Sequence, residues 1–354
     1  MITYNFISQR LDSILAARGT PMIVDWRFRH AVAFLCEDDK DGMQPIGTVF
    51  FVSVPLDLSR GNISGFSVYA ITAYHCICDY AESDVITIRA HDKGGSSYQD
   101  IETKKSEWIS HPDTDVAICD VTQRYSDSGV QSFSFEYLKP SDPSKPSYAL
   151  ALWEGDDVFT IGLFDMFAGE RRIQPIARYG KVALRPNEKV LISMKPDPKV
   201  LTPIDAYLIE METWEGQSGS PVFAYFLPDP QEHLRGSFSL GHNKPFLIGL
   251  IHGFYKGDAK RRNKGIAVVV PTESIIDLLM KEDVLKQRQL ALEQKLRERP
   301  VPERARTKRE DSVLPKADEG ITREGFEDAL KRASRRVSSS NEEALHKKSP
   351  LHKK

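Results

Sequence analysis

The chain has 354 residues, 40% of them hydrophobic, and a formal net charge of −2, which suits a globular protein long enough for two packed domains and a tail. No stretch approaches the run of about 18 apolar residues that a membrane-spanning helix needs. The segment Met1–Gly19 carries charged and polar residues where a secretory signal has its apolar run, so we expect a cytoplasmic protein.

Residues 1–24 form an expected N-terminal extension, and residues 25–138 an expected first β domain. Short apolar, β-branched and aromatic runs fill this domain, each bounded by polar or glycine-containing turns. Such spacing favours a closed barrel or a sandwich. Six strands are expected: Ala31–Cys36, Ile46–Val54, Ser67–Ala73, Val85–Ala90, Lys104–Ser110 and Val116–Val121.

A linker is expected at residues 139–150, because Lys139–Ser147 contains three prolines, and proline cannot donate to a strand ladder. A second β domain is expected over residues 151–271. Its candidate strands are Asp157–Phe164, Ile173–Leu184, Val190–Met194, Ala206–Glu212, Pro221–Phe226, Phe246–His252 and Ile266–Val270.

Helical spacing appears at the C-terminal end. Thr272, which follows Pro271, is expected to cap a helix within residues 272–299. Residues 300–354 are rich in charge and poor in apolar side chains, so we expect them to be mostly disordered. A short helix at residues 321–336 is the exception, because four apolar residues fall on one helical face: Phe326, Ala329, Leu330 and Ala333.

The charge is unevenly distributed. Residues 283–354 hold 19 Lys and Arg against 13 Asp and Glu, whereas the remainder holds 29 against 37. The tail is therefore a solvated appendage, which we prefer, a segment that docks on the acidic body of the same chain, or one that binds an acidic protein partner. Its basic cluster at residues 304–309 is flanked by the acidic residues Glu303, Glu310 and Asp311, and no aromatic residue accompanies it, so the sequence does not favour nucleic-acid binding.

Three short segments, far apart in the chain, carry the residue types of a nucleophilic site. I-T-A-Y-H-C ends an apolar run at His75, D-V-A-I places Asp115 before one, and G-Q-S-G-S-P-V places Ser218 in a glycine-rich turn. A hydroxyl is a poor nucleophile at neutral pH, so it needs a base within hydrogen-bond reach and an acid that orients the base. The chain supplies a candidate for each role.

These segments resemble the trypsin-like (chymotrypsin-fold) serine peptidases. Their counterparts there are T-A-A-H-C, D-I-A-L and G-D-S-G-G-P-V, in the same order, and the resemblance covers about residues 25–282. It implies an all-β fold of two six-stranded antiparallel β-barrels, with a C-terminal helix packed on the second barrel. It also implies a serine endopeptidase that acts on polypeptides through an acyl-enzyme intermediate, with no metal or organic cofactor.

The resemblance also implies a role for each motif residue. His75 is the general base and then the general acid, Asp115 orients it, and Ser218 is the nucleophile, while the N–H groups of Gly216 and Ser218 form the oxyanion hole. Asp113 is the rival of Asp115. We prefer Asp115 because Val-Ala-Ile follows it directly, as in the family motif.

The chain departs from the secreted members of this family. Gln217 replaces the acid that pairs with a new N-terminus after cleavage, and no I-V-G-G start is present, so we do not expect activation by N-terminal clipping. In this respect the chain is similar to HtrA-like proteases and glutamyl endopeptidases, and Ser220 also matches the glutamyl endopeptidase form. The 72 residues after Glu282 are too few and too polar for the PDZ domain of the HtrA-like proteins.

The four cysteines are expected to be reduced, because the strand before Cys76 holds no partner for a disulfide. A metal site at His75, Cys76 and Cys78 is the competing interpretation, and it lacks a second ligand pair.

Two residues are candidates for the first substrate pocket. Glu212 lies six residues before Ser218, where family members that cut after Lys or Arg keep an acid, and His252 lies where glutamyl endopeptidases use a histidine. They favour opposite specificities, so the preference stays open. The alternative function is a catalytically silent or latent trypsin-fold protein that binds peptides or acts as a sensor, for instance because Tyr74 crowds the histidine.

Overall fold

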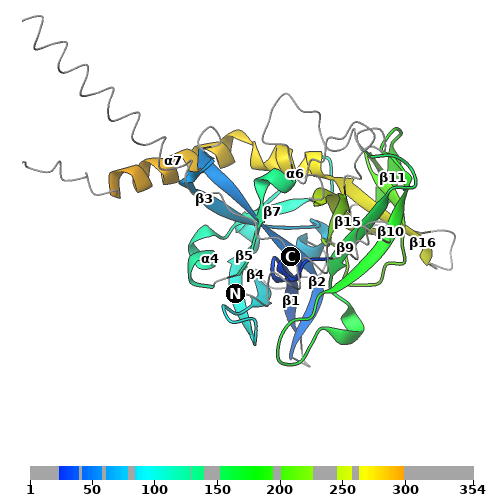
Figure 1. Ribbon diagram of the computed structural model, residues 1–354, viewed down its shortest axis with the longest axis horizontal. Helices are drawn as coiled ribbons and strands as arrows, with labels where there is room; N and C mark the ends of the chain where they lie inside the picture. The colour runs from blue at the N-terminus through cyan, green and yellow to red at the C-terminus, as the bar shows by residue number, and fades with distance from the viewer. Residues whose placement is uncertain are drawn as a thin grey trace, which may run out of the picture. The chain divides into compact units, whose positions relative to one another are not determined.

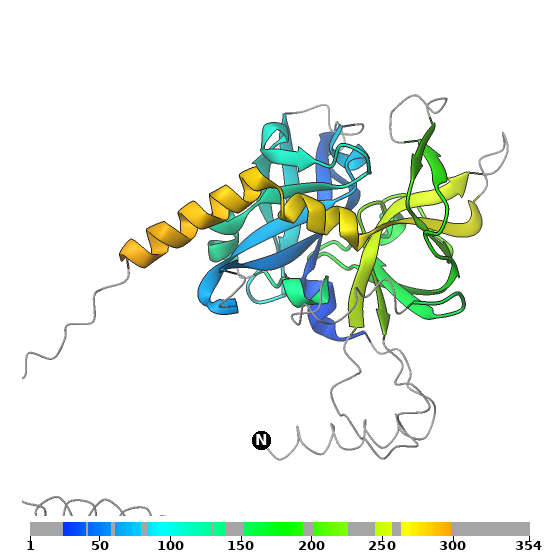
Figure 2. The same cartoon turned by 90° about the horizontal axis from the view of Figure 1, so that it is seen from above.

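A computed structural model of the chain describes residues 24–39, 42–57, 61–78, 84–128, 130–138, 152–193, 201–225, 245–256 and 263–298. All of them belong to one compact unit, Met1–Arg299. Residues 1–23 of the expected extension, the linker at 139–150, the tail at 300–354 and its short helix at 321–336 lie outside the described residues. The first half of the unit, blue to cyan, lies beside the second half, green to yellow (Figures 1 and 2).

The first half is an antiparallel sheet in the order β5-β4-β1-β2-β3-β7-β6, with the short β8 added in parallel to β2. Its end strands β5 and β6 are consecutive in the chain and joined by the three-residue 3-10 turn Lys105–Glu107, so the sheet curls until its two ends lie close together. The strands are β1 (Val32–Asp39), β2 (Gly42–Asp57), β3 (Gly61–Thr72), β4 (Val85–His91), β5 (Tyr98–Lys104), β6 (Trp108–Ser110), β7 (Ala117–Asp120) and β8 (Phe133–Ser134).

The second half is a closed six-stranded barrel in the order β10-β13-β16-β15-β14-β9, with a separate two-stranded sheet of β11 and β12. The expected all-β fold is confirmed, and the second barrel closes with six strands as expected. The strands are β9 (Asp157–Gly162), β10 (Ile176–Leu184), β11 (Val190–Ser193), β12 (Leu201–Ile204), β13 (Tyr207–Glu210), β14 (Pro221–Tyr225), β15 (Pro245–Lys256) and β16 (Asn263–Pro271).

Helices occupy the edges of this β framework. Three are short: α2 (Trp26–His30), α3 (His75–Cys78) and α4 (Thr122–Ser128). At the C-terminal end, α6 (Thr272–Leu279) packs on β15, β16 and β7, and α7 (Glu282–Glu298) packs on β2 and β3. The helix expected within residues 272–299 is thus two helices over residues 272–298, which together cover parts of both halves (Figure 2). None of the described helices is long and apolar enough to cross a membrane.

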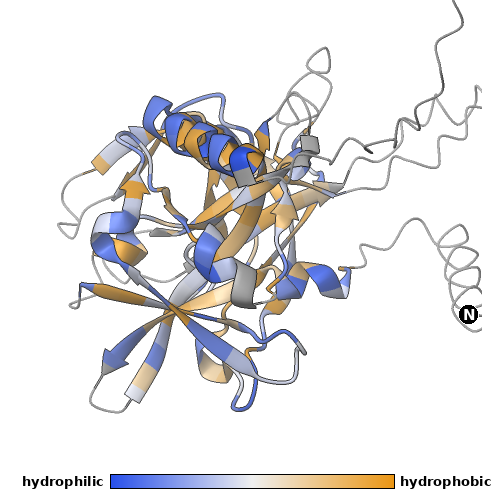
Figure 3. Cartoon of the chain, turned by 90° about the vertical axis from the view of Figure 1, so that its left-hand side faces the viewer, coloured by the Kyte–Doolittle hydropathy of each residue, from blue (hydrophilic) through white to orange (hydrophobic). Residues whose placement is uncertain are grey.

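The expected cap of the first C-terminal helix is wrong. Pro271 occupies the N-cap position, and the Thr272 hydroxyl donates instead to the carbonyl oxygen of Leu247, 2.8 Å away. This bond attaches the start of α6 to β15 of the barrel. The following helix, α7, carries hydrophilic and hydrophobic residues mixed along its length (Figure 3), and buries Val284 and Arg288.

An aromatic cluster joins the two halves. Phe28 and Phe133 of the first half lie with their ring centroids 5.0 Å from that of Phe223 in β14. Phe159 of β9 stacks on Phe223 at 5.2 Å. Because each buried aromatic pair adds about 0.5–1.5 kcal/mol beyond its buried area, this cluster holds the halves in a fixed relation.

A buried histidine makes the stability of the first half sensitive to acid. His91 is 5% exposed, stacks on His30 with centroids 4.4 Å apart, and has no hydrogen-bond partner for either ring nitrogen among the described residues. Burial, aided by the charges of His30 and Arg172, lowers the pKa of His91 to about 4. The folded protein therefore holds this ring neutral where the unfolded chain would protonate it.

We expect acid to weaken the fold through His91. As the pH falls from about 6.5, the pKa of an unperturbed histidine, towards about 4, the unfolded state binds a proton that the folded state does not. The free energy of unfolding should drop by about 2–3 kcal/mol over this range. Urea denaturation at several pH values, compared with His91→Phe, measures this. A variant with the same pH slope as the wild type would contradict the expectation.

Candidate active site

Strand register brings His75 and Asp115 together. β3 and β7 are antiparallel neighbours, with Thr72 paired to Ala117 at the end of the ladder. His75 follows Thr72 by three residues and starts α3, whereas Asp115 precedes Ala117 by two residues. Because the strands run in opposite directions, the segment that leaves β3 and the segment that enters β7 lie at the same end of the strand pair.

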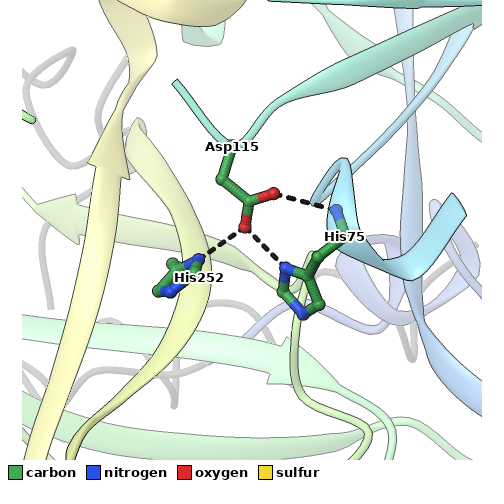
Figure 4. A group of neighbouring side chains, drawn as sticks. All are labelled: His75, Asp115 and His252. Carbon is green, nitrogen blue, oxygen red and sulfur yellow. Dashed lines mark hydrogen bonds and ion pairs between the residues drawn. The ribbon is translucent and has the colours of Figure 1, made fainter. Parts of the chain in front are cut away.

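Asp115 is fully buried, with 0% of its side chain exposed, and accepts three hydrogen bonds. The backbone N–H of His75 donates to its Oδ1 at 2.9 Å, and Nδ1 of His75 lies 2.6 Å from its Oδ2. Nδ1 of His252, in β15, lies 2.5 Å from the same Oδ2 (Figure 4). The carboxylate is thus shared between two imidazoles, one from each half of the unit.

These contacts favour the charged forms of the acid and base. Burial raises the pKa of Asp115, but the charge of His75 and the hydrogen bonds from both imidazoles outweigh it and hold that pKa well below its usual value. Burial likewise lowers the pKa of His75, while Asp115 and the neighbouring Cys76 thiol raise it well above its usual value. The site therefore stabilises an imidazolium beside a carboxylate, the charge pair that a general base forms when it takes a proton.

The carboxylate that contacts His75 is that of Asp115. Asp113 is exposed, in the bend after His111, and its backbone N–H donates to Nδ1 of His111 at 3.1 Å.

Ser218 lies in the turn between β13 and β14, on the barrel side of the site. The turn needs two glycines, because Gly216 and Gly219 have φ angles of 84° and 85°. A Cβ at Gly219 would also lie 2.1 Å from the carbonyl oxygen of Thr48 in β2. The serine turn therefore approaches the first sheet too closely for any side chain at this position.

The Ser218 hydroxyl donates to the carbonyl oxygen of His252 at 3.0 Å. Among the hydrogen bonds of the described residues, none joins Ser218 to His75. The structure thus joins His75 directly to Asp115, and joins Ser218 to Asp115 through His252.

The oxyanion-hole candidates are the N–H groups of Gly216 and Ser218. Within the described residues neither donates to a carbonyl oxygen. Gln217, 1% exposed, closes the turn with two hydrogen bonds to Trp214. Its backbone N–H donates to the Trp214 carbonyl oxygen at 3.3 Å, and its Oε1 accepts from the Trp214 N–H at 3.3 Å. The buried Gln217 therefore stabilises the turn from within.

Thr48 anchors this turn to the first sheet, a role that the sequence did not reveal. Its hydroxyl donates to the carbonyl oxygen of Gly216 at 2.9 Å and accepts from the Leu163 N–H at 2.9 Å. Its backbone N–H donates to the carbonyl oxygen of Ser218 at 2.9 Å. A threonine inside the apolar run G-T-V-F-F has the appearance of an ordinary strand residue, so no local signal distinguishes it.

We expect Thr48→Val to loosen the turn. The change keeps the shape but leaves the Leu163 N–H and the Gly216 carbonyl oxygen buried without this partner, at a cost of about 1–3 kcal/mol in unfolding free energy. Urea denaturation measures the loss. Thr48→Ser, which keeps the hydroxyl, is the matched control, and a valine variant as stable as the serine variant would contradict this role.

The two pocket candidates lie in different surroundings. Glu212 is exposed, and its carbonyl oxygen accepts from Arg178 at 3.2 Å. The Arg178 guanidinium lies over the rings of Phe164 and Trp214, at 5.8 and 5.7 Å from their centroids. The side chain of His252 contacts Asp115, so its assignment to a substrate pocket, like that of Glu212, stays a prediction.

His75, Asp115 and His252 are also the residue types that bind transition metals, and their ligand atoms lie within 4.8 Å of one another. The two Nδ1–Oδ2 distances, 2.6 and 2.5 Å, are short even for hydrogen bonds to a charged group. Ligands held at about 2.0–2.2 Å around a tetrahedral zinc ion stand roughly 3.3–3.6 Å apart. The cluster in this geometry therefore fits shared protons and does not fit a metal ion.

All four cysteines are free: Cys36, Cys76 and Cys119 are buried and Cys78 is exposed. Burial raises the pKa of the Cys36 and Cys119 thiols to about 12, which makes both poor nucleophiles. Cys76 Sγ lies 3.7 Å from Nε2 of His75, at the edge of the site.

No protein-family model and no curated protein sequence matches the chain. Its structural neighbours include the active form of the Rv3671c protease from M. tuberculosis, at 17% identity and a TM-score of 0.42, covering 72% of this chain and 81% of that one. The inactive form of the Rv3671c protease matches at 16% identity and a TM-score of 0.40, covering 76% and 92%. The HtrA-type protease AlgW with a decapeptide matches at 15% and 0.40, covering 74% and 66%. Likeness this distant does not transfer an activity.

Proposed function

We propose that this chain is a serine endopeptidase with His75 as the base, Asp115 as the orienting acid and Ser218 as the nucleophile. The observation that carries the proposal is the buried Asp115 carboxylate, which accepts one hydrogen bond from the backbone N–H of His75 and another from Nδ1 of its ring. This double contact fixes the ring orientation and points the Nδ1–H of His75 at the carboxylate, so that Nε2 is the ring nitrogen that accepts a proton from the serine.

The proposed reaction starts with rotation of the Ser218 hydroxyl from the carbonyl oxygen of His252 towards His75. Oγ attacks the peptide carbonyl carbon while its proton passes to Nε2 of His75. The developing oxyanion accepts from the N–H groups of Gly216 and Ser218. The imidazolium then protonates the leaving amine, and a water molecule, deprotonated by His75, releases the acyl group from Ser218.

A fluorophosphonate probe tests the proposal, because it reacts with an activated serine and not with an ordinary one. We expect one adduct per chain, which mass spectrometry of tryptic peptides should place on Ser218. Incubation with a peptide library gives the cleavage preference in the same experiment. A folded sample that neither reacts with the probe nor cleaves the library would contradict the proposal.

A second candidate is a trypsin-fold protein that binds peptides without cleaving them, or that is latent. The hydrogen bond from Ser218 to the main chain of His252 favours it, because a hydroxyl held there is not activated by the imidazole. Peptide binding without labelling by the probe would support this candidate. Labelling that appears only after removal of residues 300–354 would support latency.

We further propose a polypeptide substrate and a reducing, cytoplasmic setting. The four free cysteines support that setting, because thiols persist where glutathione and thioredoxin keep them reduced. We also propose that the basic tail can bind an acidic protein partner.

A further inference from the structure

His252 contacts both ends of the proposed triad. Its ring Nδ1 lies 2.5 Å from Asp115 Oδ2, and its carbonyl oxygen accepts from the Ser218 hydroxyl at 3.0 Å. The residue belongs to β15, which pairs with β14, the strand that begins just after the Ser218 turn. Asp115 and His75 belong to the other half of the unit. One residue thus connects the nucleophile to the acid across the boundary between the halves.

The shared carboxylate also connects the two imidazoles electrostatically. Asp115 carries one negative charge and is buried, with its Oδ2 between the Nδ1 atoms of His75 and His252. The two rings meet edge to face, with centroids 5.3 Å apart (Figure 4). The titratable groups that face His252 within the described residues are Asp115 and His75, with the Cys76 thiol behind His75. When a second hydrogen-bond donor also stabilises the negative charge of Asp115, the carboxylate stabilises a proton on His75 less strongly.

We propose that His252 is a positioning residue for this site: it holds Asp115 in register with the serine half and, by sharing the carboxylate, makes His75 less basic. The inference rests on the proposed function, since it assigns His252 a part in the same reaction. It differs from the expectation that His252 lines the substrate pocket, because a ring bonded to Asp115 acts on the acid and base whatever the substrate.

Two variants distinguish the effect of the hydrogen-bond donor of His252 from the effect of its side-chain volume. In His252→Asn, Nδ2 is bonded to Cγ as Nδ1 is in histidine, so the donor to Asp115 is retained, whereas His252→Leu removes it. We expect the leucine variant to lose about 10- to 100-fold in kcat, as for loss of a hydrogen bond to a charged group, with KM little changed. Its acid limb of activity should move to higher pH, because Asp115 then acts on His75 alone. The asparagine variant should stay close to the wild type in both.

A second measurement does not depend on catalysis. Nitrogen-15 labelled histidine in the full-length Ser218→Ala protein should show two imidazole Nδ1–H resonances shifted far downfield, one for His75 and one for His252. His252→Leu in this background should remove one and keep the other, while circular dichroism shows that the variant is folded.

The outcomes are distinct. Two downfield resonances, with the loss of kcat and the shifted acid limb in the leucine variant, would support the inference. A single resonance in the parent protein, or a leucine variant with the kcat and acid limb of the wild type, would overturn it. Two resonances in the Ser218→Ala protein, together with a wild-type protein that never reacts with the fluorophosphonate probe, would contradict the proposed function and leave the contact of His252 with Asp115 intact.

Discussion

Replacing Ser218 by alanine is expected to lower kcat by about 10⁶-fold and to abolish fluorophosphonate labelling, because it removes the Oγ that forms the acyl-enzyme bond in the proposed reaction. Fold stability should hardly change. The hydroxyl makes one hydrogen bond, to the carbonyl oxygen of His252, and the turn itself is fixed by Thr48 and by its two glycines. Cleavage of a fluorogenic peptide, chosen from the library experiment, measures the loss.

Ser220 provides the matched control two residues further on. Its side chain is fully buried, and its Oγ has no hydrogen-bond partner within the described residues. Ser220→Ala therefore removes a hydroxyl from the same turn without removing a bond of the site, and its kcat should stay within a few-fold of the wild type. Equal losses in both variants would attribute the effect to the turn and would refute Ser218 as the nucleophile.

Replacing Asp115 by asparagine is expected to lower kcat by about 10⁴-fold near neutral pH. The amide group cannot accept from the His75 N–H, the His75 ring and the His252 ring at once, because its nitrogen is a donor. A ring facing that nitrogen must turn its Nδ1 lone pair towards it, which puts the proton on Nε2, where the serine needs an acceptor. Peptide cleavage over a range of pH measures the loss.

Asp113→Asn is the control for this variant. Asp113 is exposed and contributes its backbone N–H, not its carboxylate, to the bond with His111. We expect kcat to be unchanged. If the two asparagine variants lost activity equally, the assignment of Asp115 as the orienting acid would be wrong.

The strands that the sequence predicted best are those whose apolar residues face a core. Val158, Phe159 and Ile161 of β9 are at most 1% exposed, and the prediction Asp157–Phe164 differs from β9 by two residues at one end. β5 was missed as a separate strand because it lies at the edge of its sheet and buries only Ile101 and Thr103, so its sequence, Y-Q-D-I-E-T-K, has almost no apolar pattern. β12 pairs only with β11, outside the barrel, and carries equally little signal.

For the candidate site, the motifs named the residues, and the register of β3 and β7 brings His75 and Asp115 into contact as those motifs suggested. The roles of Thr48 and His252 could not be predicted in the same way. Each acts on a residue of the opposite half of the unit, and such contacts depend on how the sheet and the barrel pack, which no local pattern encodes. The triad itself, as a working catalytic unit, stays a prediction until Ser218 is tested.

The Ser218 turn lies so close to Thr48 that a single methyl group at Gly219 would collide with the sheet. Catalytic geometry tolerates little error, and a displacement of about 1 Å can cost 10²-fold in rate. In the proposed enzyme, a shift of this size between the sheet and the barrel would displace Ser218 from His75 and Asp115 and slow the reaction. The packing of the two halves therefore belongs to the proposed catalytic machinery as much as the three side chains do.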